Sequence, residues 1–208
     1  MQKLKYLLFV SLLAFGSCSS NKTLTTKYYV IEQPSHADTL HQVTDTLLNI
    51  WCEIGSVEIY PAFAVHQIAN RTKSHELVYY NHHQWAVRPE TFFTQMLIEH
   101  FGENNIFAGA ATRFWRINPD YSLQTTVYKL ETLNLNKQLA AHVELKFTLM
   151  DTQTNKTLYE YKVDRTEWLQ ERDLNLFASA IGTIFHEEIQ TFSKQLVKEL
   201  GPKKEASK

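Results

Sequence analysis

The chain has 208 residues, of which 44% are hydrophobic and 21% are charged. This composition is typical of a globular protein and excludes an intrinsically disordered chain. The formal net charge is −1, which gives no electrostatic reason to expect a nucleic acid as a partner.

The first eighteen residues have the pattern of a secretory signal peptide. Lys3 and Lys5 give a positive start, and residues 6–15 form an apolar run that only Ser11 interrupts. This run is too short to cross a bilayer, which requires about 20 residues. Small residues precede Cys18 and polar residues follow it. The arrangement resembles the leader of a bacterial lipoprotein, in which the cysteine is lipidated and becomes the mature N-terminus.

We therefore expect four segments along the chain. They are a lipoprotein signal peptide over residues 1–17, a lipidated Cys18 with a flexible tether over residues 18–27, one α+β domain over residues 28–201, and a disordered tail over residues 202–208. Each buried methylene contributes about 0.8 kcal/mol, so acyl chains such as palmitate would hold the domain on a membrane without a spanning helix. An incidental thiol near a cleavage site, or an uncleaved anchor helix, is the alternative.

The first part of the domain is predicted to be rich in short strands. β-Branched and aromatic residues favour strands, and Pro, Asn, Ser and Asp favour the loops between them. We expect a strand at 28–31, a loop at 33–38, a loop or a poor helix at 39–49, a strand over 50–63 that ends at Pro61, and a hairpin of 67–69 with 76–80 around the link 70–74.

A helix is predicted to follow the hairpin. Pro89 suits the first helical position and Glu90 suits the positive end of the helix dipole. Apolar residues then recur at helical spacing as far as Phe101, and Gly102 occupies the place of a C-terminal cap. Residues 106–114 are a candidate strand.

The second half has the clearest periodicity. Apolar and polar residues alternate over 121–130, with a phase shift at Leu130, and again over 141–150 and 158–165. Turn-rich links separate these stretches, so they predict an antiparallel meander. The last element is a long amphipathic helix that begins after Asp173, a predicted N-cap, and ends at Gly201-Pro202.

These elements predict a two-layer α+β sandwich with a mainly antiparallel sheet. Two helices cannot cover both faces of such a sheet, so we expect both main helices on one face. The other face, or an edge strand, must then meet water or a partner.

We expect no catalytic residues, no cofactor and no metal. The sequence has no Walker phosphate-binding motif and no Gly-x-Ser-x-Gly motif. His82-His83 would point to opposite faces of a strand, and His186-Glu187-Glu188 lacks the second histidine of a zinc-protease helix. The histidines are therefore predicted to be solvated or at the core edge, and Glu187 and Glu188 to be solvated. A pocket that combines a histidine with a carboxylate would favour an enzyme instead.

Cys52 has two interpretations. If Cys18 carries lipid, Cys52 has no disulfide partner within the chain, because the sequence has only two cysteines. It is then either a reactive or intermolecular thiol, or a buried cysteine that behaves as a small hydrophobic residue. The second interpretation is favoured because Trp51 and an apolar run adjoin it.

Several short motifs follow one another in a defined order. They are Cys18, Tyr28-Tyr29-Val30-Ile31, Gly55-Ser56-Val57-Glu58-Ile59-Tyr60-Pro61, Gln67-Ile68-Ala69-Asn70-Arg71 and Gln84-Trp85-Ala86-Val87-Arg88-Pro89. With the closing amphipathic helix, this order resembles the ABC-type transport auxiliary lipoprotein family over nearly the whole mature chain. The family's Arg-Trp-Ala-x-Pro motif is altered here, because Gln84 replaces the arginine and one extra residue precedes the proline.

The resemblance singles out a set of family-motif residues with a structural or a partner-contact role. They are Gln67, Arg71, Trp85, Arg88 and Pro89. Trp85 and Pro89 also fit a purely structural role, as a tryptophan packed under a helix start and a helix-initiating proline.

The resemblance also implies a function. Such lipoproteins work with an MCE-type substrate-binding protein, and with an ABC permease and an ATPase, to move lipids between the two membranes. Ser19, in place of Asp after Cys18, fits sorting to the outer membrane, so we expect a lipid-anchored protein of the cell envelope that faces the periplasm. Family members can form rings, which makes a homo-oligomeric ring an arrangement to test. An outer-membrane assembly lipoprotein for a β-barrel partner and a periplasmic enzyme remain alternatives.

Overall fold

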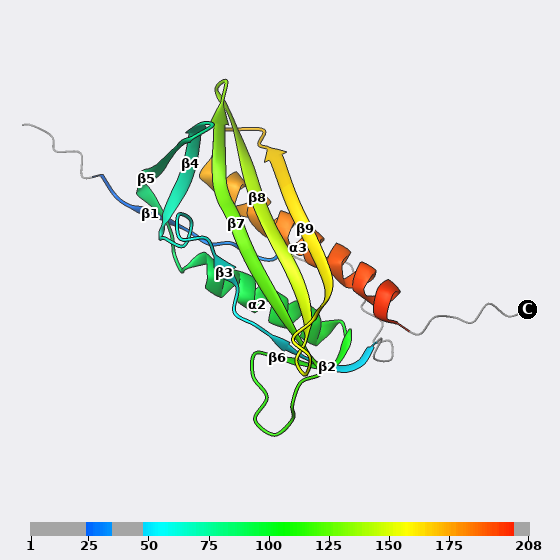
Figure 1. Ribbon diagram of the computed structural model, residues 1–208. Helices are drawn as coiled ribbons and strands as arrows, with labels where there is room; N and C mark the ends of the chain where they lie inside the picture. The colour runs from blue at the N-terminus through cyan, green and yellow to red at the C-terminus, as the bar shows by residue number, and fades with distance from the viewer. Residues whose placement is uncertain (1–23, 35–47, 202–208) are drawn as a thin grey trace, which may run out of the picture.

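A computed structural model describes residues 24–34 and 48–201 of the chain (Figure 1). The predicted signal peptide, Cys18 and the predicted tail lie outside the described residues, as does most of the ambiguous stretch 39–49. The described elements, in chain order, are β1 (Lys27–Tyr29), β2 (Leu48–Ile54), β3 (Glu58–Ile59), β4 (Gln67–Lys73), β5 (Glu76–Trp85), α2 (Pro89–Glu103), β6 (Phe107–Ala111), β7 (Tyr121–Leu135), β8 (Gln138–Asp151), β9 (Thr157–Trp168) and α3 (Leu174–Leu200).

The long strand β7 organises the sheet. Along one edge it pairs antiparallel with β8, which in turn pairs antiparallel with β9. Along its other edge it pairs in parallel with β2, β3 and β4 in succession, and β5 and β1 continue the sheet beyond β4. The predicted meander is confirmed, and the phase shift before Leu130 is a register shift between Val127 and Lys129.

Both helices lie on one face of the sheet, behind β7, β8 and β9 in Figure 1. Alternation along β8 turns Val143, Leu145, Phe147 and Leu149 toward them, and all four are buried. Phe147 packs against Phe192 of α3 with ring centroids 5.0 Å apart. Burying each such side chain stabilises the fold by roughly 1.5–3 kcal/mol. The predicted two-layer α+β fold with a mainly antiparallel sheet and both helices on one face is confirmed.

No helix among residues 24–34 and 48–201 has the length and apolar character that crossing a membrane requires.

Several predicted boundaries differ from the structure. The first strand spans Lys27–Tyr29, so Ile31 lies beyond it although it is buried. The predicted strand over 50–63 divides into β2 and β3. The break begins at Gly55, whose N–H donates to the carbonyl of Leu123, while the Val57 N–H donates to the Thr94 hydroxyl of α2. The chain therefore leaves the strand conformation for residues 55–57 and then returns to the edge of β7 as β3.

The predicted cap at Gly102 is wrong. Gly102 lies inside α2, and Asn104 ends the helix by donating its backbone N–H to His100 O. Asn105 then takes the left-handed conformation, with φ of 49°. Asparagine tolerates this conformation, so the glycine is not needed for it. In α3, by contrast, the predicted cap is confirmed, because the Asp173 carboxylate accepts from Asn175 N.

The remaining strands are close to prediction. The hairpin of β4 and β5 is antiparallel, but its strands extend into the predicted link and leave only residues 74–75 as the turn. The candidate strand over 106–114 is shorter, because β6 ends at Ala111 and the chain continues as a loop to Tyr121.

Candidate docking site around the N-terminal strand

The strand that follows the predicted tether lies at an edge of the sheet. β1 pairs in parallel with β5, which places Tyr29 opposite Trp85. The Tyr29 hydroxyl lies 2.7 Å from Nδ1 of His83. Burial lowers the pKa of His83, and the charges of Lys27 and His82 lower it further, so the neutral ring can accept the hydrogen bond from Tyr29.

Two of the family-motif residues meet beside this strand. Trp85 is buried against Phe177 of α3, with ring centroids 5.6 Å apart, and its backbone N–H donates to His66 O at 2.7 Å. Gln67 begins β4 and is opposite Gln84 in the register with β5. The structure therefore brings Gln67 and Trp85 together at the end of the β4–β5 hairpin, next to β1.

The other family-motif residues lie elsewhere. Pro89 occupies the first position of α2 and is buried, whereas Arg88 is exposed and lies 3.6 Å from the Glu90 carboxylate. Arg71 lies near the far end of β4, where it contacts Glu131. Five residues that the sequence grouped by motif thus occupy three separate places.

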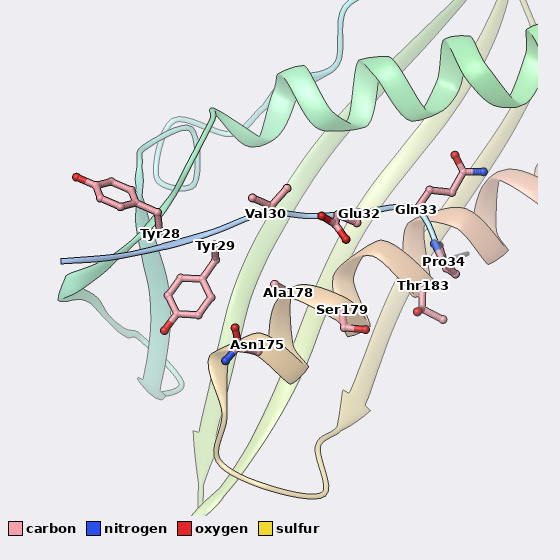
Figure 2. Close-up of a pocket in the computed structure, with 10 residues that line it drawn as sticks. All are labelled: Tyr28, Tyr29, Val30, Glu32, Gln33, Pro34, Asn175, Ala178, Ser179 and Thr183. Carbon is pink, nitrogen blue, oxygen red and sulfur yellow. The ribbon is translucent and has the colours of Figure 1, made fainter. Parts of the chain in front are cut away.

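A cavity of about 510 Å³ lies between the N-terminal segment and the first half of α3 (Figure 2). Asn175, Ser179 and Thr183 are spaced four residues apart on α3, so they share the helix face beside this cavity. The segment approaches α3 closely next to it, because a Cβ on Gly182 would lie 2.2 Å from the carbonyl oxygen of Glu32. The full lining is Tyr28, Tyr29, Val30, Glu32, Gln33, Pro34, Asn175, Ala178, Ser179 and Thr183.

A second cavity, of about 280 Å³, adjoins β1. It is lined by Lys27, Tyr29, Tyr80, His83, Leu139, Arg172, Asp173 and Leu174. Tyr29 therefore lines both cavities. The hydroxyl, amide and charged groups around the N-terminal segment can hydrogen-bond to a polar chain or headgroup.

A row of charged side chains crosses the sheet on the face opposite the helices. Arg71 Nε donates to Glu131 Oε1 at 2.7 Å, and His142 Nδ1 lies 3.0 Å from the same oxygen. His142 Nε2 lies 2.9 Å from Asp164 Oδ1. We call these four residues, one each from β4, β7, β8 and β9, the charged row. Adjacent Val143 faces the helices, so His142 must face the other way.

The charged row contains a buried carboxylate. Glu131 is fully buried, and its Oε2 has no hydrogen-bond partner among the described residues. Burial raises its pKa, but His142 and Arg71 outweigh burial, so the pKa of Glu131 lies below its usual value. Burial lowers the pKa of His142, but its hydrogen bonds to Glu131 and Asp164 outweigh burial and raise it. The row therefore favours a charged imidazolium between two carboxylates.

The charged row combines a histidine with carboxylates, which is the feature that would favour an enzyme. However, its residues line neither of the two cavities, and both ring nitrogens of His142 are engaged by carboxylates. Its contacts instead join four strands.

The sequence prediction of a solvated or core-edge histidine misses this role. One feature of the sequence points to it: Glu131 and His142 both occupy polar positions in strands where apolar and polar residues alternate, which places them on the face opposite the core.

The prediction that Glu188 is solvated is also wrong. It faces β9, where the Tyr161 hydroxyl donates to its Oε2 at 2.7 Å and Arg165 lies 3.2 Å from Oε1. Burial raises the pKa of Tyr161 to about 12, and Glu188 adds to the rise, so the hydroxyl keeps its proton. Glu187 is more exposed but lies 2.6 Å from Arg165. These contacts fasten α3 to the edge strand.

Cys52 is fully buried, as the favoured interpretation predicts. Burial raises the pKa of its thiol to about 12, which disfavours the reactive thiolate. Among residues 24–34 and 48–201, no group of three or more His, Cys, Asp or Glu side chains is arranged to hold a metal ion.

Comparison with known proteins gives a family match over most of the chain. The model of the ABC-type transport auxiliary lipoprotein component family matches residues 29–187. No curated protein matches. Among solved structures, protein XCC0632 from Xanthomonas campestris is 15% identical with a TM-score of 0.63, and the match covers 82% of this chain and 92% of that one. A second solved structure, of an uncharacterized protein, is 12% identical with a TM-score of 0.62, and the match covers 82% of this chain and 99% of that one. At these identities the solved structures show a shared fold.

Proposed function

Because this chain belongs to the family of ABC-type transport auxiliary lipoprotein components, we propose that it is the lipid-anchored auxiliary subunit of an ABC transport system of the MCE type, which moves lipids. The family is one of transport components of the cell envelope rather than a family of enzymes. Its partners in the proposal are an MCE-type substrate-binding protein, a permease and an ATPase. The family match is the observation that carries the proposal.

The anchor in this proposal is Cys18. The residues before it have the pattern of a lipoprotein leader, and Ser19 after it favours the outer membrane, facing the periplasm. Only residues 19–26 separate the proposed lipidated Cys18 from β1, which begins at Lys27. The candidate docking site around β1 would therefore stay within one short segment of the membrane surface.

Docking, rather than chemistry, is the proposed mechanism. The helices cover one face of the sheet, so partners are left the opposite face, the edge strands and the exposed motif residues. Gln67 and Arg88 are exposed, and the 3.6 Å ion pair between Arg88 and Glu90 is a long surface contact of little energetic value. They are the motif residues whose side chains are best placed to meet a partner.

The proposal is tested by anchoring and by copurification together. The tagged full-length chain should incorporate labelled fatty acid, fractionate with membranes and recover an MCE-type protein in mild detergent. Cys18→Ser should abolish labelling and leave an unprocessed or soluble protein, whereas Cys52→Ala should retain the label. Label retained in the Cys18 variant would refute the anchor.

Partner contact is tested in the same purification. Gln67→Ala with Arg88→Ala should lower recovery of the MCE-type protein, and Lys198→Ala, at an exposed position of α3, serves as the matched control. Recovery of the chain alone, or of a β-barrel protein in place of an MCE-type protein, would contradict the proposal. The second result would favour the alternative role in outer-membrane assembly.

A further inference from the structure

The loop between β6 and β7 presents an exposed tryptophan. Residues 112–120 extend below the rest of the fold in Figure 1. Trp115 is 83% exposed, and Ile117, two residues on, is 41% exposed. Trp115 is the most exposed large hydrophobic side chain among the described residues. A large apolar ring that is exposed to water on a projecting loop indicates an interaction site.

Two arginines flank this tryptophan. The Arg113 guanidinium lies over the Trp115 ring at 4.4 Å from its centroid, and Arg116 follows directly. Both arginines are exposed. From Asn104 to Pro119 the sequence has no acidic residue, so these two charges are not neutralised within the segment. The tip therefore combines an amphipathic ring with a positive charge on either side.

The base of the loop is fastened to the sheet. Trp51 N donates to the Asp120 carboxylate at 2.7 Å, and Asp120 N donates to Trp51 O at 2.8 Å. Phe114 turns inward and meets Trp51 edge-on, with ring centroids 5.4 Å apart. Because Phe114 packs inward, its neighbour Trp115 is directed away from the body. The exposure of Trp115 follows from this anchoring and not from a loose chain.

We propose that this tip is a second membrane contact, in which Trp115 enters the headgroup layer and Arg113 and Arg116 bind the phosphates of anionic phospholipids. Tryptophan prefers the interface between water and acyl chains, because one side of the ring is apolar and its N–H requires a polar partner. Arginine suits phosphate oxygens because its guanidinium donates two parallel hydrogen bonds. This contact is distinct from the acyl anchor and goes beyond the proposed function.

The geometry favours a lipid surface over a protein partner. A specific protein interface buries about 800 Å² on each side, which requires a broad complementary surface. The Trp115 tip is a narrow projection with adjacent apolar and basic side chains. The family description as a lipoprotein places the chain at a membrane, where a projecting tip can meet the bilayer.

Tryptophan quenching by brominated lipids tests the proposal. The full chain purified from membranes is reconstituted into vesicles of phosphatidylethanolamine and phosphatidylglycerol whose acyl chains carry bromine. Wild-type emission should be quenched, and Trp115→Phe should remove the quenched component because it removes the reporter. Trp168→Phe is the matched control, since Trp168 is also exposed, at 51%, but lies at the end of β9. Quenching that persists in the Trp115 variant would overturn the proposal.

The anionic requirement is tested separately. Replacing phosphatidylglycerol with phosphatidylcholine, or introducing Arg113→Gln with Arg116→Gln, should weaken the Trp115 contact roughly tenfold or more. Equal quenching under all these conditions would refute the assignment to anionic headgroups. If the Trp115 variant instead loses an MCE-type partner while quenching is unchanged, the tip is a protein contact. If the wild-type protein copurifies with no MCE-type protein but its emission is still quenched, the proposed function is refuted and the membrane contact is not.

Discussion

His142 connects two carboxylates on a face of the sheet that the helices leave uncovered. Its raised pKa means that the folded state binds a proton more tightly than the unfolded state does. The resulting stabilisation is fully present below the unfolded value near 6.5 and is lost as the pH rises through the higher folded value. Glu131, with its lowered pKa, adds stabilisation that is present above its usual pKa of 4.5 and is lost as the pH falls. Together the two groups make their largest contribution to the stability of the folded state at mildly acidic pH.

His142→Gln should therefore destabilise the protein in a pH-dependent way. At about pH 5.5 the variant loses a charged hydrogen-bonding partner of a buried carboxylate, which costs about 1–3 kcal/mol. At about pH 8, above the unfolded-state pKa near 6.5, the unfolded chain has released this proton and the stabilisation that depends on it declines, so the difference in free energy of unfolding should shrink. Urea denaturation at both pH values measures this difference. His75→Gln, at an exposed position, should show little effect. A cost that is equal at the two pH values would contradict the charged state inferred for His142.

The charged row also shows what the sequence could not provide. Arg71, Glu131, His142 and Asp164 come from four strands, and only the register brings them into contact. Alternation in one strand predicts which face a residue occupies, but not its neighbour on the next strand. The burial of Trp85, by contrast, was suggested by the sequence. A tryptophan just before a helix-initiating proline is expected to pack under the start of the helix.

Helices and strands were predicted correctly where the residues that define them are adjacent in the sequence. The bounds of α3 follow from Asp173, an apolar stripe and Gly201-Pro202, all adjacent to the element they define, and the structure agrees. The parallel pairing of β7 with β2, β3 and β4 depends on contacts between distant segments. No sequence pattern within β7 encodes those partners, so the meander was predicted and the parallel half of the sheet was not.

Gly182 marks where α3 and the N-terminal segment meet, and Gly182→Ala should loosen that contact. Helix propensity alone would make alanine more stable by about 0.5–1 kcal/mol. However, the new Cβ would lie 2.2 Å from the backbone oxygen of Glu32, which must move. We expect a net loss of about 1–3 kcal/mol and weaker protection of amides near Ile31. Urea denaturation and hydrogen exchange measure the two effects.

Gly102→Ala in α2 is the matched control for this prediction. A Cβ at Gly102 would meet nothing within 4 Å, so only the propensity term applies and the variant should gain up to about 1 kcal/mol. If the two alanine variants gave the same change in free energy of unfolding, the close approach at Gly182 would have no energetic consequence.

The whole molecule divides into a strongly paired centre and a weakly paired N-terminal edge. β7 and β8 pair along nearly their full length, and α3 covers the buried face of β8. β1 has three residues, pairs on one side with β5 and lies between two cavities. In the proposed function this edge is also the part nearest the lipid anchor. A pull on the tether, or a docking partner, would therefore act first on this weakly paired edge.

Hydrogen exchange on the full chain should resolve this gradient. Amides in the middle of β7 and β8, such as Val127 and Leu145, should exchange only through global unfolding. Amides of Tyr28 and Tyr29 should exchange at least about 100-fold faster, because β1 is three residues long and pairs with β5 over those three residues. β6, a five-residue strand that pairs with β2, is the internal comparison and should be intermediate. Protection of β1 equal to that of β8 would mean that the N-terminal segment is an integral part of the core, and force on the anchor would then have to unfold the whole domain to release it.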